Sequence, residues 1–261
     1  MVLIKPAILP AVTALPFWLF LRHMPLLPAL AFTTAFALAA WGLRAVTASG
    51  ALTGLVLSTI ICLAAGAPGF MAVLTLFLLT MLATRFGYAK KKRCGTAERE
   101  QGRSGRQVLA NLGIACITVA PLLYWHARSW VLLVGFAAAL AEAAADTVSS
   151  EVGQVLSPRR AYLITSYERV EAGTNGAISF AGCMAGLIAS GVVAAVCLLF
   201  DLLVPRWFWP ATLCGFAGML LDSLLGATLE RPDRLGNNSV NFLSSAFSAF
   251  VAILLAFLSR G

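Results

Sequence analysis

Apolar runs of about 20 residues recur along this chain, and short polar or glycine- and proline-containing segments separate them. A run of this length spans the hydrocarbon core of a bilayer as a helix. Because the runs are continuous rather than alternating, they argue against a membrane barrel. The pattern predicts an all-α, polytopic transmembrane helical bundle of seven to nine spans, with nine preferred, in a single domain over residues 1–261. The expected helices cover residues 6–22, 26–44, 50–66, 68–87, 106–125, 129–151, 175–201, 207–229 and 239–259.

The distribution of basic residues predicts the orientation of these helices. With nine spans and the 88–105 loop in the cytoplasm, fifteen of the nineteen Lys and Arg residues fall on the cytoplasmic side and four on the other. The positive-inside rule predicts such an asymmetry. We therefore expect an integral protein of the bacterial cytoplasmic membrane, with the N-terminus, a basic loop at 88–105 and a second loop at 154–172 in the cytoplasm. Both histidines, His23 and His126, are expected on the opposite side.

Composition argues against a soluble domain and against a nucleic-acid-binding role. Of the 261 residues, 60% are hydrophobic and 11% are charged, which is too apolar for a soluble domain of this length. The net charge is +8, but the cations lie in loops between apolar runs, where orientation and contact with anionic lipid explain them. We expect membrane lipids and no nucleic acid as partners, and the sequence leaves the oligomeric state open.

Acidic residues near the membrane edge are the first candidates for chemistry, because burying an acid in a membrane is costly. On the 129–151 helix, Glu142, Asp146 and Ser149 recur at helical spacing and share one stripe, while Glu151 lies off it, nearer the membrane edge. Carboxylates and hydroxyls suit Mg²⁺, which binds oxygen ligands and substrate phosphates. A polar helix end would explain Glu151 equally well, and Glu142 could be a hydrogen-bonded structural acid.

A second acid lies on the predicted 207–229 helix. Gly218, Asp222 and Gly226 follow one another four residues apart on one face, with Ser223 beside them. The glycines allow close helix contact, so the acid between them is held against a neighbouring helix. Asp222 is a second candidate metal ligand, and a structural acid is the alternative.

Two glycine- and amide-rich segments are candidate phosphate-binding elements. Gly173, Thr174, Asn175 and Gly176 stand at the expected start of the 175–201 helix, where free N–H groups and the helix dipole favour an anion. The same residues are also ordinary N-cap chemistry. The segment 237–241 opens the last helix, where its asparagine side chains cap the helix or bind a ligand.

Basic and amide residues before and within the 106–125 helix form a further element. The cluster Lys90–Arg93 alone is typical of an orientation signal on anionic lipid. Gln107 and Asn111 differ, because they lie four residues apart on one face and enter a predicted span, which indicates ligand contact. The chain has no glycine-rich Walker-type phosphate loop, so a soluble nucleotide-binding fold is not indicated.

These segments together resemble the signature elements of the integral-membrane prenyl-phosphate kinases, typified by the plant phytyl-phosphate kinase of vitamin E synthesis. Residues 145–153 read ADTVSSEVG, 173–179 read GTNGAIS, 222–229 read DSLLGATL, 106–111 read RQVLAN and 237–241 read NNSVN. Their order and spacing agree with the family over about residues 40–245. The combination is specific, whereas each element alone is common.

The resemblance implies phosphorylation of an isoprenyl monophosphate (phytyl, geranylgeranyl or farnesyl) to the diphosphate, with Mg²⁺ and a nucleoside triphosphate donor, CTP being favoured. The departures from the family pattern, Val148, Ser149 and Ala177, leave the ionisable positions untouched. The alternatives are a carrier or scramblase for a lipid phosphate and a CTP-dependent cytidylyltransferase. Because the acceptor is an ionised phosphate, no histidine base is needed.

The residues expected to act in this reaction fall into two groups. The catalytic and metal-binding group consists of Asp146, Asp222 and Glu151. The phosphate- and nucleotide-binding group consists of Lys92, Arg103, Arg106, Gln107, Asn111, Gly173, Thr174, Asn175, Gly176, Ser223, Asn238 and Asn241. All are expected at one end of the bundle, at the cytoplasmic rim.

Overall fold

The computed structural model describes residues 24–259 apart from 94, 96–101 and 126–128, so the predicted first helix at 6–22 and both histidines lie outside it. Eight α-helices make up the described bundle. They are α2 (Leu26–Gly42), α3 (Ala48–Arg85), α4 (Tyr88–Arg93), α5 (Gly105–Val119), α6 (Ser129–Leu156), α7 (Phe180–Leu199), α8 (Phe208–Leu225) and α9 (Asn237–Leu258). Short helical turns η1 (Ala120–Leu123), η2 (Pro205–Trp207) and the π-helical η3 (Gly226–Glu230) adjoin α5 and α8.

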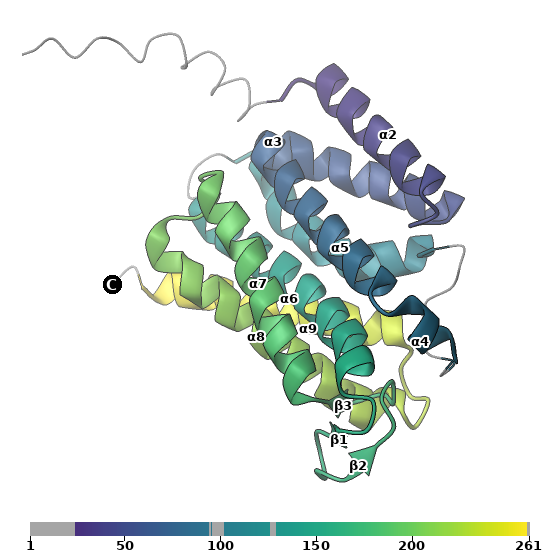
Figure 1. Cartoon of the computed structure of the whole chain (residues 1–261). Coiled ribbons are helices and arrows are strands. Elements are labelled where there is room, and N and C mark those ends of the chain that lie inside the picture. Colours follow the sequence, from purple (N-terminus) through teal and green to yellow (C-terminus); the bar gives the residue numbers. More distant parts are fainter. Residues whose placement is uncertain (1–23, 94, 96–101, 126–128, 260–261) are drawn as a thin grey trace, which may run out of the picture.

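Six helical segments of the described chain are long and apolar enough to cross a membrane, and α2 is an apolar helix of 17 residues. They begin with α3 and continue through α5, α6, α7, α8 and α9. This confirms the predicted all-α polytopic bundle, whereas seven to nine crossings stay a prediction. Figure 1 shows α2 along one edge of the bundle and a small sheet at one end.

The longest helical segment, α3, is bent sharply at Gly66. Gly66 has φ 68° and ψ −168°, which lies outside the helical region and is accessible to glycine because it has no Cβ. Pro68 follows within the predicted break between the 50–66 and 68–87 helices. The segment then returns to the end from which it started, because Arg85 Nη2 lies 3.4 Å from Leu43 O, just before α3 begins.

Helix α6 runs through the centre of the bundle and packs against α3, α5, α7, α8 and α9. Small residues on its neighbours allow this close approach. A Cβ added at Gly182 of α7 would lie 2.7 Å from Ser149 O, and one added at Gly215 of α8 would lie 2.7 Å from Ala141 Cβ. The acids of α6 are thereby held close to the backbones of the surrounding helices.

A small antiparallel sheet joins α6 to α7. It has the strand order β2-β1-β3, from β1 (Ala161–Leu163), β2 (Arg169–Val170) and β3 (Ala177–Ile178). The helix start predicted at residue 175 is wrong, because α7 begins at Phe180 after the N-cap Ser179. Gly173 and Gly176 have φ +94° and +80°, values that form turns rather than a right-handed helix. The predicted 154–172 loop therefore contains the end of α6 and two of these strands.

Candidate functional site

A polar cavity of about 240 Å³ opens beside the sheet, where the end of α6 meets the end of α8. It is lined from α6 by Asp146, Ser149, Ser150, Gly153 and Gln154, from the sheet region by residues 161 and 172–179, and from α8 onward by Asp222, Ser223, Gly226, Glu230 and Asn237. The structure thus brings together in one cavity Asp146, Asp222, Ser223 and the whole Gly173–Gly176 turn, which are far apart in the sequence.

The carboxylates of Asp146 and Asp222 lie beside each other in this cavity and interact directly. Ser244 of α9 lies behind them, with its Oγ 3.0 Å from Asp222 Oδ2 and 2.7 Å from Glu142 Oε1. Ser245 donates a hydrogen bond to the second carboxylate oxygen of Glu142, which is 1% exposed. A hydroxyl has one proton to donate, so this cluster carries more acceptors than donors and favours a bound cation.

The glycine-rich turn is held against the end of α8 by direct backbone contact. A Cβ added at Gly176 would lie 2.4 Å from Ala227 Cβ and 2.6 Å from Ala227 N, so only glycine fits without displacement. The next residue upstream, Asn175, makes a side-chain hydrogen bond with Glu230 at the end of η3. The turn and the end of α8 therefore form one wall of the polar cavity, and Thr174 lines the cavity between them.

The predicted basic and amide residues have different surroundings. Arg103 interacts electrostatically with Asp146, and its Nη2 lies 3.5 Å from Thr84 Oγ1. Gln107 completes a capping box at the start of α5, which is a structural role. Lys92 and Arg106 are exposed and line neither cavity of the site.

Glu151 does not join the aspartates. It forms a buried ion pair with Lys91 of α4, whose Nζ also donates to Thr84 O at 2.7 Å and to Ala83 O at 3.1 Å. The polar cavity is not lined by Glu151. Its five-residue spacing from Asp146 is the reason, because five residues turn a helix by about 140° beyond one full turn. The structure therefore assigns Glu151 a partner other than a metal.

Amide oxygens near the aspartates are left without protein partners. Asn241 Nδ2 donates to Asn111 Oδ1 at 3.2 Å, which joins α9 to α5. Asn241 Oδ1 and Gln154 Oε1 are buried and accept no hydrogen bond from any described residue, and Gln154 lines the polar cavity. Such orphaned acceptors are rare in folded proteins, where an ordered water, a cation or a donor on a ligand satisfies them. Asn238 is partly buried in the first turn of α9 and lines neither cavity.

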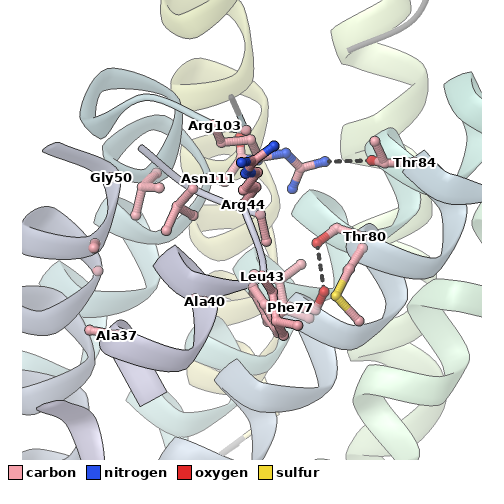
Figure 2. A pocket seen from close by; sticks show the side chains of 18 of the residues that line it. Ala37, Ala40, Leu43, Arg44, Gly50, Phe77, Thr80, Thr84, Arg103 and Asn111 are labelled. Atoms are coloured by element: carbon pink, nitrogen blue, oxygen red, sulfur yellow. Dashed lines mark hydrogen bonds between the residues drawn. The ribbon is translucent and has the colours of Figure 1, made fainter. Parts of the chain in front are cut away.

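A second cavity, of about 460 Å³ and mostly apolar, lies between α2, the two arms of α3 and α5. Figure 2 shows Arg44, Arg103 and Asn111 close together at one end, while Ala37 and Phe77 lie toward the other. Arg103 and Asn111 line this cavity but not the polar one. Arg103 interacts electrostatically with Asp146, and Asn111 accepts a hydrogen bond from Asn241, so these residues connect the apolar cavity to the region of the aspartates.

The donor set of the polar cavity fits Mg²⁺ bound together with a phosphate. Among the described residues, no group of three His, Cys, Asp or Glu side chains is arranged to hold a metal ion by itself. Mg²⁺ is commonly held by one or two carboxylates plus substrate phosphates and waters. Asp146 and Asp222 supply two such carboxylates in one cavity, and Gln154 Oε1 is an unsatisfied oxygen in the same lining.

Sequence reasoning missed three residues of this region. Ser244 follows Asn241 by three residues on one face of α9, and this polar stripe within an apolar helix was a readable signal. Glu230 ends η3 and lines the polar cavity. Arg44 lines the apolar cavity, but nothing in its sequence context distinguishes it from an orientation signal.

Comparisons with known proteins agree on one group of relatives. The family model "Integral membrane protein DUF92" matches residues 31–249. The chain is 31% identical over 220 residues to "Protein VTE6, chloroplastic" of Arabidopsis thaliana, which covers 80% of this chain and 65% of that protein. It is 34% identical over 214 residues to "Uncharacterized membrane protein MJ0933" of Methanocaldococcus jannaschii, covering 81% and 86% of the two chains. No solved structure matches the chain.

Proposed function

This chain belongs to the DUF92 family of integral membrane proteins, and from that membership and its polar cavity we propose that it phosphorylates an isoprenyl monophosphate to the diphosphate. The resemblance of its motifs to the prenyl-phosphate kinases is confirmed at the level of the family, with VTE6 among the relatives. The substrate class of phytyl, geranylgeranyl or farnesyl monophosphate, the donor CTP and the ion Mg²⁺ are all part of the proposal.

The observation that carries the proposal is the contact between Asp146 and Asp222 beside the Gly173–Gly176 turn. A soluble phosphotransferase uses the same two parts, namely carboxylates for a metal and glycine backbone for phosphate oxygens. Asp146 and Asp222 would hold Mg²⁺, which would offset the negative charge that develops on the phosphates during transfer.

Transfer in this site needs positioning rather than proton removal. An oxygen of the acceptor phosphate forms a bond to the γ-phosphorus of the donor, the bond from that phosphorus to its bridging oxygen breaks, and the nucleoside diphosphate leaves. The acceptor oxygen is already ionised, so no base is required. The backbone of the glycine turn and the Ser223 hydroxyl bind donor oxygens, and Arg103, next to Asp146, offsets negative charge where donor and acceptor meet.

The membrane orientation is part of the same proposal. Both cavities lie at one end of the described bundle, the end to which the predicted orientation assigns fifteen of the nineteen Lys and Arg residues. By the positive-inside rule this end faces the cytoplasm of a bacterial cell, where nucleoside triphosphates are present. Nine crossings then follow if α2 and the first predicted helix at 6–22 also span the membrane and the two arms of α3 count separately.

Product analysis tests this function directly. Purified protein in detergent, with geranylgeranyl or farnesyl monophosphate, Mg²⁺ and each of the four nucleoside triphosphates, is expected to give the isoprenyl diphosphate and a nucleoside diphosphate, fastest with CTP. Release of pyrophosphate with a nucleotide-lipid product would instead identify a cytidylyltransferase. Movement of the lipid phosphate across vesicles without nucleotide consumption would identify a carrier or scramblase.

A further inference from the structure

We infer that the apolar cavity between α2, α3 and α5 is the acceptor site, which takes the chain of an isoprenyl monophosphate and holds its phosphate between Arg44 and Arg103. This inference rests on the proposed function and adds to it the place of the lipid. The polar cavity is then left to the nucleotide, so donor and acceptor reach the aspartates from two sides.

The cavity has the chemical asymmetry that a lipid monophosphate needs. Its walls are apolar side chains from three helices, including Phe36, Leu76 and Val108. Its polar residues gather at one end, where the guanidinium groups of Arg44 and Arg103 lie close together (Figure 2). A volume of about 460 Å³ falls within the range of sites that bury small ligands.

The cationic end is built by two backbone segments locked together. Arg103 N donates to Ala45 O at 3.0 Å, and Thr47 N donates to Arg103 O at 3.0 Å. Gly102, with φ +79°, lies so close to the segment that an added Cβ would be 2.4 Å from the carbonyl carbon of Ala45. Arg44 itself has φ +55°, an uncommon value for a residue with a side chain. This fixed geometry holds both arginines over the opening.

Aromatic rings give the cavity a floor. The ring of Phe36 contacts Phe77 and Phe70, with centroid distances of 5.0 and 5.4 Å. Six residues separate Phe36 from Gly42, the last residue of α2, which corresponds to about 9 Å of helix. The rings therefore lie well below the arginines and limit how far a lipid chain extends from them.

The position of the acceptor phosphate follows from two residues that connect the apolar cavity to the region of the aspartates. Arg103 lines the apolar cavity and interacts with Asp146, and Asn111 lines it and bonds to Asn241. A phosphate held at Arg103 thus lies next to the aspartates that face the polar cavity. This arrangement explains why the family motif around Asn111 belongs to the same site as the motif around Asp146.

Gly54 offers a variant that fills the cavity without disturbing its walls. An added Cβ there would meet a single neighbour, Val108 Cγ1, at the ordinary contact distance of 3.8 Å, so Gly54→Leu extends into the cavity. Gly42→Leu is the matched control, because a Cβ there meets nothing within 4 Å and Gly42 lies outside the lining. Phe77→Ala is the opposite change, because it removes an aromatic ring from the lining and deepens the cavity.

The test measures binding without any nucleotide, by thermal stabilisation of purified protein with farnesyl monophosphate, geranylgeranyl monophosphate or farnesol. We expect Gly54→Leu to weaken binding of farnesyl monophosphate at least tenfold, Gly42→Leu to bind like wild type, and Phe77→Ala to shift preference toward the 20-carbon chain. Farnesol should stabilise least. Unchanged binding by a folded Gly54→Leu protein would overturn the inference.

Photocrosslinking gives a readout on the wild-type chain that needs no variant. A farnesyl monophosphate with a diazirine at the end of its chain should label peptides of α2 and α3, whereas labels confined to α7–α9 would overturn the inference. Binding and labelling at α2 and α3 without any phosphate transfer would refute the proposed kinase and leave the lipid site standing. Phosphate transfer with labels outside α2 and α3 would support the proposed kinase and refute the lipid site.

Discussion

The buried ion pair between Lys91 and Glu151 yields the sharpest prediction about stability, and it separates a structural acid from a catalytic one. Lys91 is 1% exposed and the Glu151 side chain 9% exposed. Replacing Glu151 by Leu leaves the buried ammonium of Lys91 without its carboxylate partner, although its hydrogen bonds to Ala83 O and Thr84 O remain. Breaking one side of such a pair costs about 3–5 kcal/mol, because the remaining charge stays desolvated.

A double-mutant cycle measures the effect. We expect Glu151→Leu and Lys91→Met each to lower the free energy of unfolding by about 3–5 kcal/mol, and the double variant to recover most of that loss, with a coupling energy of about 2–3 kcal/mol. Unfolding is followed by titration with a denaturing detergent in mixed micelles. Glu168→Leu, at an exposed position of the sheet region, is the control and should change stability by less than about 0.5 kcal/mol.

Phosphate transfer by the same variants completes the cycle. The double variant should retain transfer, because Glu151 lies outside the polar cavity. If Glu151→Leu kept its stability but lost transfer, and Lys91→Met did not restore it, Glu151 would be acting on the phosphates and the structural interpretation of the pair would be refuted.

Three further predictions concern the polar cavity. Gly176→Ala should destabilise the protein by at least about 1–2 kcal/mol from its left-handed backbone alone. Gly42→Ala, with nothing within 4 Å of the added Cβ, should be nearly neutral in the same detergent titration. Ser244→Ala removes a hydroxyl placed between Asp222 and Glu142 and should cost about 1–3 kcal/mol of stability; an unchanged unfolding curve would contradict that. Chelation of Mg²⁺ should stop transfer, with return of activity on adding Mg²⁺ as the check.

Most of the helical fold was predictable because membrane helices are set by the length of apolar runs. The break between the predicted 50–66 and 68–87 helices lies where the structure bends at Gly66, since glycine and proline chemistry is local and readable. The start of α7 was not predictable in the same way. Gly173 and Gly176 suit a capped helix start and a turn between strands equally well. The turn forms because strand β1 pairs with strand β3, and sequence reasoning does not show that pairing.

The residues of the candidate site were predictable where several motifs occur together in the sequence. They were not predictable where an ion pair with a distant residue determines the role of a side chain. Asp146 and Asp222 line the same cavity, as expected from their positions near helix ends on the same predicted side of the membrane. Glu151 belongs to the same motif as Asp146, yet its helical phase turns it toward Lys91, a residue that sequence alone groups with the orientation signal. The lipid cavity was hidden too, because apolar residues that line a cavity look the same in sequence as those that fill a core.

One measurement tests the central claim, that Asp146 and Asp222 act together on metal-bound phosphate. The assay follows transfer of radiolabel from the γ-phosphate of the nucleoside triphosphate to an isoprenyl monophosphate. It compares the variants Asp146→Asn and Asp222→Asn with the control Asp201→Asn. Asp201 is exposed and lies in the segment between α7 and α8. We expect both site variants to remain folded and to lose transfer by at least about a hundredfold, with Asp201→Asn unaffected. Wild-type transfer by either site variant would contradict the account.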